Sequence, residues 1–261
     1  MHILIRYLTS FLISLTLLLS SACYATQVVR LTSGEWPPYL SNHLAEGGFA
    51  TKIVTEAFNE MGIEVEISYY PWKRSYNYAM EGKDPGGNIW HGTIVWIKTE
   101  QRMKSFYYSD PVITDEDVLF YLAKSSLHWK TVADLEGKII GGTAHTAYPT
   151  FEKAHKDGLI TLQRGGNYDS LLKRIFHQKI DAAQMPKQVG LYYLNHSFST
   201  AEQKQFTYSP TVIERRTYHL ILSKNRDENK ALLKLFNQGL AKLHSNGRYR
   251  SLVSQLRRGS Y

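Results

Sequence analysis

The chain has 261 residues, 43% of them hydrophobic, which is enough for one large domain or two lobes with their own cores. Lysine and arginine number 31 against 23 aspartates and glutamates, giving a formal net charge of +8. The basic residues are scattered and form no nucleic-acid-binding motif. The charge therefore predicts a solvated basic surface and no nucleic-acid partner.

The first 25 residues have the organisation of a secretory signal peptide. Arg6 supplies the positive charge, residues 8–19 form an apolar core, and a cleavage site follows Ala25. The core is shorter than the about 20 residues that a transmembrane helix needs. We expect residues 1–25 to be removed on export to the periplasm. Lipid attachment at Cys23, the only cysteine, is the alternative, because residues 19–23 form a degraded lipoprotein box.

The mature chain then alternates strands and helices. The hydrophobic periodicity predicts, in chain order, strand 27–32, helix 49–61, strand 63–69, helix 72–81 and strand 93–97. A second cycle follows, with strands 118–123, 138–142, 159–163, 180–183, near 206 and 218–223, and helices 131–135, 147–155, 168–177, 188–194, 228–245 and 248–257. This order indicates mostly parallel sheets with helices on their faces.

Two such cycles predict two α/β lobes. We expect lobe 1 to comprise residues 26–113 and 217–261, and lobe 2 residues 114–216. The extended segments 112–117 and 212–217 are the candidate crossings. A chain that crosses twice has a cleft between its lobes and a two-strand hinge.

Thr99 and Arg102 form the pattern that most clearly indicates a binding site. They stand three residues apart, just after the apolar run 93–97. If Thr99 opens a helical turn, its side chain and the Arg102 guanidinium face the same side. Helix-start N–H groups and a planar five-donor guanidinium together favour a carboxylate. A surface arginine beside Glu100 is the alternative.

The residues around this pattern carry a family resemblance. Thr99-x-x-Arg102, followed by Phe106 and Ser109-Asp110-Pro111, resembles the signature region of the family 3 extracellular solute-binding proteins, the periplasmic polar-amino-acid receptors of ABC importers. Weaker matches extend over the mature chain, at residues 36–39, 71–74, 133–138, 179–183 and 246–247. The resemblance implies a bilobal α/β fold of the periplasmic-binding-protein-like type II. It also implies that Arg102 clamps a ligand carboxylate and that the closed form docks on an inner-membrane ABC permease; we expect a monomer.

Aromatic side chains are candidates to enclose the organic body of the ligand. They are Trp36, Tyr39 and Trp72, and packing on their own lobe is the alternative for the first two. Arg74 is a further candidate for the same cleft. For Arg74, pairing with an acid at a helix start is the alternative.

Polar side chains at predicted strand ends and helix starts complete the expected site. Thr99, Thr146 and Gln184 are expected to satisfy the remaining polar groups of the ligand. N-capping of the following helix is the alternative for Thr146.

One departure from the family bears on the ligand. Amino-acid receptors of the family usually place an acid for the ammonium group shortly after the strand at 180–183, where this chain has Gln184-Met185-Pro186-Lys187. A zwitterion would then bury an unpaired charge, which is costly. The sequence therefore predicts an anionic or apolar-bodied ligand.

Enzymatic chemistry finds little support in the sequence. The histidines are scattered without metal-ligand spacing, and the mature chain has no thiol, so we expect no metal, cofactor or catalytic residue. The acids Asp110 and Asp115 are expected in a solvated hinge. A sensor-type binding protein and a dehydratase-like enzyme on the same scaffold are the alternative functions.

Overall fold

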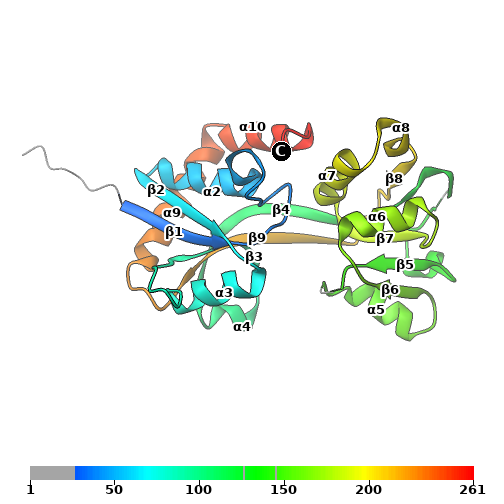
Figure 1. The fold of residues 1–261 in the computed structure, drawn as a ribbon, viewed down its shortest axis with the longest axis horizontal. Coiled ribbons are helices and arrows are strands. Elements are labelled where there is room, and N and C mark those ends of the chain that lie inside the picture. Colours follow the sequence, from blue (N-terminus) through cyan, green and yellow to red (C-terminus); the bar gives the residue numbers. More distant parts are fainter. Residues whose placement is uncertain (1–26, 126, 145) are drawn as a thin grey trace, which may run out of the picture.

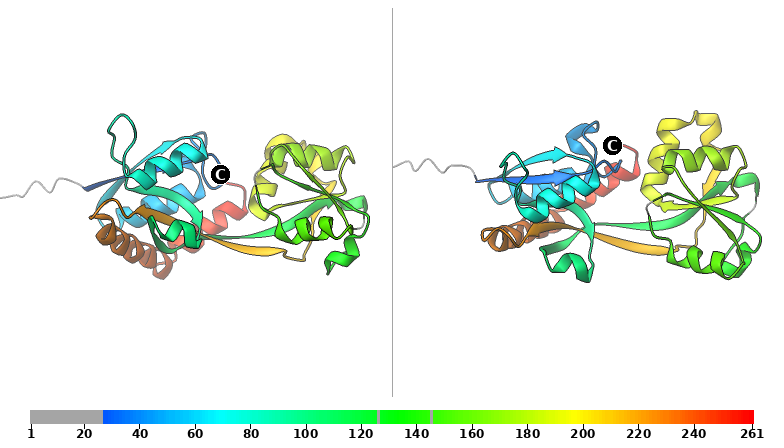
Figure 2. Two further views of the ribbon diagram at one scale, coloured as in Figure 1. Left: turned by 90° about the horizontal axis from the view of Figure 1, so that it is seen from below. Right: turned by 60° about the horizontal axis from the view of Figure 1, so that its bottom comes forward.

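The computed structural model describes residues 27–125, 127–144 and 146–261, so the predicted signal peptide and Cys23 lie outside the described residues. Two α/β lobes lie side by side along the long axis (Figure 1). The strands β4 (Phe106–Leu122) and β9 (Glu214–Ser223) run from one lobe to the other in every view (Figures 1 and 2). The predicted bilobal α/β fold is confirmed.

The first lobe is built from both ends of the chain. Its elements are β1 (Gln27–Ser33), η1 (Ala45–Gly47), α2 (Phe49–Asn59), β2 (Ile63–Tyr69), α3 (Trp72–Glu81), β3 (Gly92–Ile97), α4 (Glu100–Met103), α9 (Asn229–Ser245) and α10 (Arg248–Arg257). The four-residue spacing of Phe49, Ile53 and Ala57 puts all three on the buried face of α2. The helix α3 ends at Gly82, whose φ of 72° is the left-handed C-cap that glycine adopts without strain.

The second lobe is formed by the middle of the chain. Its elements are η2 (Ala123–Ser125), η3 (Val132–Leu135), β5 (Ile139–Gly142), α5 (Pro149–Lys156), β6 (Thr161–Arg164), α6 (Tyr168–Phe176), β7 (Ala182–Pro186), α7 (Lys187–Ser197), α8 (Thr200–Gln203) and β8 (Phe206–Tyr208). Asn167 starts α6 with a capping box, since its side chain accepts from the Ser170 N–H at 2.9 Å. The short helix α8 was not predicted.

Among the described residues, nine strands form one sheet in the order β2-β1-β3-β9-β4-β7-β5-β6, with β8 paired to β4. The strand β1 pairs in parallel with β2 and β3, and β5 pairs in parallel with β6 and β7. The two hinge strands are antiparallel, with Asp115 opposite Arg216 and Asp117 opposite Glu214. The predicted separate strand 118–123 is wrong, because it is the end of the 17-residue β4. The strands pass unbroken through the predicted lobe limits, which stay a prediction.

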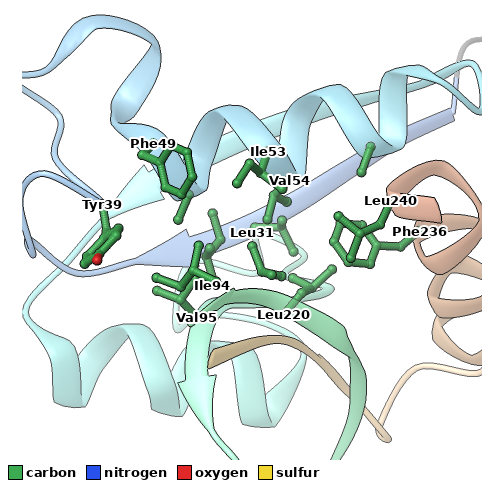
Figure 3. Close-up of a cluster of buried hydrophobic side chains, with 14 of the residues drawn as sticks. Leu31, Tyr39, Phe49, Ile53, Val54, Ile94, Val95, Leu220, Phe236 and Leu240 are labelled. Carbon is green, nitrogen blue, oxygen red and sulfur yellow. The ribbon is translucent and has the colours of Figure 1, made fainter. Parts of the chain in front are cut away.

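Each lobe has its own hydrophobic core. In the first lobe, α2 and α9 cover β1, β3 and β9, with Ile53, Leu31 and Phe236 among the buried contacts (Figure 3). In the second lobe, alternate residues of β4 face opposite sides of the sheet, so Phe120 packs with α6 and Leu119 with α5. Within the described residues, no helix combines the length and apolarity needed to cross a membrane. Separate cores joined by two strands leave the lobes able to move about the hinge.

Candidate functional site

A cleft of about 410 Å³ lies between the lobes and is bounded by both lobes and by the hinge. It is lined by Glu35, Trp36, Trp72, Val95, Trp96, Ile97, Arg102, Asp117, Thr143, Ala144, Thr146, Tyr148, Gly166, Asn167, Tyr168, Met185, Pro186, Tyr193, Arg216 and Tyr218. Its size and its mixture of aromatic and charged side chains suit a small organic ligand.

Arg102 enters this cleft from α4. Thr99 is the N-cap of that helix, and its Oγ1 accepts from the Arg102 N–H at 3.2 Å, so the predicted helical turn is confirmed. The guanidinium lies over the Trp96 ring, 4.7 Å from its centroid, and donates to the Ile97 carbonyl at 3.0 Å. Within the described residues Arg102 forms no ion pair, with Glu100 or with any other acid. These contacts hold the guanidinium in place, and Arg102 lines the cleft.

The cleft face of β3 has an unusual backbone. The buried residue Val95 has a φ of 52°, in the left-handed region that β-branched residues rarely adopt. The pairing of β3 with β9 is irregular between Thr93 and Trp96. Strain of this kind persists only where packing enforces it, and it is common at functional sites. Here it lies directly before Trp96 and Ile97, the two residues that hold Arg102.

Aromatic rings form much of the cleft wall. Trp36 lies 4.8 Å from Tyr218 of the hinge, and Trp72 meets Trp96 edge-on at 5.3 Å. The Trp72 ring lies against the backbone at Gly34, where an added Cβ would be 2.4 Å from the indole. The wall therefore consists of rings held by one another and by a residue without a side chain.

The second lobe adds hydroxyl groups after β5. The Tyr148 hydroxyl accepts from the Thr143 N–H at 2.8 Å, and Thr143 Oγ1 donates to Thr146 Oγ1 at 2.7 Å. The Tyr148 ring packs against Gly142, where a Cβ would lie 2.5 Å from it. This network connects Thr143, Thr146 and Tyr148, which line the cleft from the second lobe.

The sequence reasoning missed Asp117, a cleft residue on β4. It is 2% exposed, and its Oδ2 accepts from Gln184 Nε2 at 2.8 Å. Burial raises the pKa of the Asp117 carboxyl, while Arg216, 3.6 Å away, and the Gln184 hydrogen bond oppose that rise. A carboxylate therefore stands beside Gln184, although none follows the strand in sequence, so the predicted anionic or apolar-bodied ligand has no support from a lack of acids in the cleft. Asp117 and Gln184 are far apart in sequence, so their contact could not be predicted. The run of acids at 115–117 is the one sequence signal that could have indicated Asp117.

The structure brings four of the predicted ligand residues together in the cleft: Trp36, Trp72, Arg102 and Thr146. Thr99 and Gln184 lie behind the lining and hold Arg102 and Asp117 respectively. Tyr39 and Arg74 do not line the cleft.

Arg74 is exposed on α3. Tyr39 is 1% exposed, and its ring packs against Trp36 at 4.7 Å. Its hydroxyl donates to Asp115 Oδ2 at 2.6 Å, and both residues line a different cavity from the cleft. Tyr39 therefore supports the cleft wall through Trp36 and does not itself line the cleft.

Asp115 lines a second cavity of about 580 Å³, between β4 and the helices α7 and α10. It is 5% exposed, and burial raises its pKa to about 6 despite hydrogen bonds from Tyr39 and from the Glu116 N–H. The expectation of a solvated hinge is wrong for Asp115, because its side chain is buried beside Tyr39 in a cavity that residues of α7 and α10 also line. Asp110 is exposed, as expected.

No set of three or more histidine, cysteine, aspartate or glutamate side chains in the described part of the chain is placed to hold a metal ion. The described cleft lining combines one guanidinium free of acids, a second arginine paired with acids, two carboxylates and a wall of rings.

The model of the bacterial extracellular solute-binding proteins, family 3, matches residues 28–256 of the chain. No curated protein matches its sequence. The matched range contains both lobes and both hinge strands.

Solved structures share the fold. An ancestral arginine-binding protein bound to arginine is similar with a TM-score of 0.64 and 18% identity, over 88% of this chain and 97% of that one. The second substrate-binding domain of Lactococcus lactis GlnP, in an open conformation, is similar with a TM-score of 0.66 and 17% identity, over 89% of this chain and 96% of that one. A histidine kinase sensor domain with similarity to periplasmic binding proteins is similar with a TM-score of 0.63 and 17% identity, over 89% of this chain and 96% of that one. These likenesses confirm the predicted type II fold.

Proposed function

Since the chain belongs to the bacterial extracellular solute-binding proteins of family 3, we propose that it captures a small carboxylate-bearing ligand between its lobes and delivers it to an ABC permease. Arg102 binds the carboxylate. Trp36 and Trp72 enclose the organic body of the ligand, and Thr146 contributes a hydroxyl from the other lobe. The protein is exported to the periplasm by its N-terminal segment and acts there as a monomer.

The observation that carries this proposal is that Arg102 lines the cleft without an acidic partner among the described residues. Its guanidinium lines the cleft, is held by Trp96 and Ile97, and has no acidic partner in the described chain. A cation fixed in a half-buried cleft without a counter-ion is prepared for an anion, and its planar fork matches a carboxylate. The surrounding rings favour a ligand whose body is apolar or aromatic.

Thermal unfolding of the mature protein against amino acids, dicarboxylates, peptides and aromatic acids tests the proposal. A ligand at 100 times its Kd should stabilise the protein by about 2.7 kcal/mol. We expect Arg102→Ala to weaken binding of that ligand by about 100-fold, because the carboxylate loses its charged partner. Arg102→Lys should recover only part of the affinity, since it restores the charge without the fork.

Arg250→Ala is the matched control, because Arg250 is an exposed arginine on α10, away from the cleft lining. It should leave ligand affinity unchanged. If the stabilising compounds bind Arg102→Ala as tightly as the wild type, Arg102 is not the carboxylate partner. If no carboxylate in the panel stabilises the wild type, the proposed ligand class is wrong.

A second candidate function is ligand reception for a sensor protein. It is supported by the likeness to a histidine kinase sensor domain. Capture of solubilised membrane proteins on the immobilised chain, with and without the ligand found above, separates the two functions. Ligand-dependent retention of an ABC permease supports delivery, and retention of a histidine kinase supports sensing.

A further inference from the structure

The second cavity, of about 580 Å³, is bounded by both lobes and by the hinge strand β4. The first lobe contributes Phe49 of α2 and one face of α10, and the second lobe contributes α7 and Tyr208 of β8. Among the described residues, none lines both this cavity and the ligand cleft. Small-molecule sites in proteins have volumes of about 300–1,000 Å³. The second cavity is therefore large enough for a ligand of its own.

Much of the wall of the second cavity is apolar. Phe49, Ile113 and Leu256 are buried, and Leu191 and Val253 are half-buried. These side chains come from α2, β4, α7 and α10, so apolar surface from both lobes meets in one space. Such a wall favours a ligand with an apolar body, because binding removes the apolar surfaces of both from water.

Both acids that line the second cavity already have partners. Asp115 accepts hydrogen bonds from the Tyr39 hydroxyl at 2.6 Å and from the Glu116 N–H at 2.8 Å. Glu116 Oε1 accepts from Arg215 Nε at 2.9 Å, and this pair joins β4 to β9. The acids therefore leave the other two cations of the lining without an ion pair.

These two cations are Lys187 and Arg257, one from each lobe. Lys187 is the first residue of α7 and is half-buried, and its Nζ lies 4.4 Å from the centroid of the Tyr208 ring. Arg257 is the last residue of α10 and is exposed, so the lining extends to solvent. Among the described residues, neither forms an ion pair, and three cations against two acids give the lining a formal charge of +1. This arrangement favours an anionic group between α7 and α10.

We propose that the second cavity is a binding site for a free organic carboxylate with an apolar chain, separate from the ligand cleft. Lys187 and Arg257 bind the carboxylate of this ligand. Its chain lies against the apolar wall that Phe49, Ile113 and Val253 form. The site is outside the proposed function and does not depend on it. Because the ligand contacts both α7 and α10, it connects the two lobes at a place other than the cleft.

Calorimetric titration of the mature chain carrying Arg102→Ala tests this site, since that change removes the proposed carboxylate partner in the cleft. Octanoate is the probe, 1-octanol has the same chain without the charge, and acetate has the carboxylate without the chain. We expect octanoate to bind with a Kd below about 1 mM. It should bind at least about 10-fold more tightly than either of the other compounds, because only octanoate contacts both the cations and the apolar wall.

Second substitutions in the same chain locate the bound octanoate. Lys187→Met, which removes a half-buried charge and keeps an apolar side chain, should weaken octanoate binding by about 10-fold and leave octanol binding unchanged. Arg257→Met should weaken it by about 3-fold, because exposed ion pairs contribute less. Val253→Trp fills the cavity and should weaken octanoate and octanol alike. Arg258→Met is the control, since Arg258 is an exposed arginine outside the lining of the second cavity.

Several results would overturn the site. If octanoate does not bind up to about 1 mM, where the binding free energy is only about 4 kcal/mol, the ligand class is wrong. If Lys187→Met and Val253→Trp leave octanoate binding unchanged, the acid binds elsewhere on the protein. Equal weakening by Arg258→Met would mean unspecific attraction to a basic surface. None of these results concerns the test of Arg102, which uses the wild-type cleft and its own ligands, so the site and the proposed function can fail separately.

Discussion

Asp115 and Asp117 stand two residues apart on β4 and have different surroundings. Asp117 lines the ligand cleft, whereas Asp115 lines the second cavity and is held by Tyr39. Tyr39 in turn packs against Trp36 of the cleft wall. The buried Asp115 carboxyl is therefore connected to the cleft wall through the Tyr39 and Trp36 rings, which are tilted by 45° to each other.

Burial makes the ionisation of Asp115 a term in the stability of the protein. Its pKa rises from 3.8 to about 6 in the fold, chiefly through burial. Between these values the folded state holds a proton that the unfolded state releases, so the free energy of unfolding falls as pH rises from about 4 to about 6. The contribution is fully present below that window and lost above it. A rise of this size corresponds to about 3 kcal/mol.

We expect Asp115→Asn to stabilise the protein above pH 6, because asparagine cannot ionise. The difference in unfolding free energy between this variant and the wild type should grow by about 3 kcal/mol between pH 4 and pH 6.5 and then stay constant. Urea unfolding at pH 4 to 8 measures it. Asp110→Asn, which alters an exposed acid on the same strand, should show no such window. A difference that is flat in pH for Asp115→Asn would mean that the acid is ionised in the fold at no cost.

The sequence could predict site residues whose geometry is local. Thr99 and Arg102 are three residues apart, and a capped helical turn follows from that spacing alone. Asp117 depends on contact with Gln184, 67 residues away, which no spacing reveals. Tyr39 was misplaced for the same reason, since its partner Asp115 is 76 residues away.

At the scale of elements, the contact between the end of β1 and the start of α3 shapes the aromatic wall. Gly34 follows β1, and the Trp72 indole at the start of α3 lies against it. The φ of Gly34 is outside the left-handed region, so alanine is acceptable to the backbone. The obstacle to a side chain at Gly34 is therefore the Trp72 ring and not the backbone conformation.

We expect Gly34→Ala to weaken ligand binding while changing stability little. The added Cβ would lie 2.4 Å from the indole, so Trp72 must move within the cleft. A displaced ring in the wall should cost about 10-fold in affinity, in line with one lost aromatic contact. Gly86→Ala, in the exposed turn before β3, is the control, because its Cβ meets only polar side-chain tips at 3.2 Å or more. Wild-type affinity in Gly34→Ala, with a normal unfolding midpoint, would exclude Trp72 from the binding wall.

The hydrophobic periodicity predicted the helices and the inner strands, but it did not predict the continuous hinge strand β4. The helix α10 occupies the predicted range, because its apolar spacing and the preceding Gly247 are local signals. The strand β4 was divided in the prediction, since Pro111 and the run of acids at 115–117 interrupt the apolar alternation. Pairing with β9 maintains the strand through that run. Cross-strand pairing between distant segments is a tertiary effect that local patterns do not contain.

At the scale of the whole molecule, each lobe contains a core of its own, and β4 and β9 connect them. Val189 of α7 joins the first-lobe cluster across the hinge, so α7 is tied to both. The strands β5 and β6 pack in the second lobe, away from this contact. This separation predicts that without ligand the lobes open independently, as cooperative units of different stability.

Gly239→Ala is a perturbation confined to the first lobe. Its Cβ would lie 1.8 Å from the Ala57 carbonyl oxygen, where α9 crosses α2, and neither backbone can yield without repacking the core. The steric cost, about 1–3 kcal/mol, outweighs the gain in helix propensity of about 1 kcal/mol. We expect amide hydrogen exchange in β1 and α2 to accelerate by up to about 30-fold, while exchange in β5 and β6 stays at the wild-type rate. Gln238→Ala, an exposed change in the same helix, should alter neither lobe. Equal acceleration in both lobes would mean that the hinge strands couple them into one folding unit, and cleft closure would then require strain within the cores instead of rotation about β4 and β9.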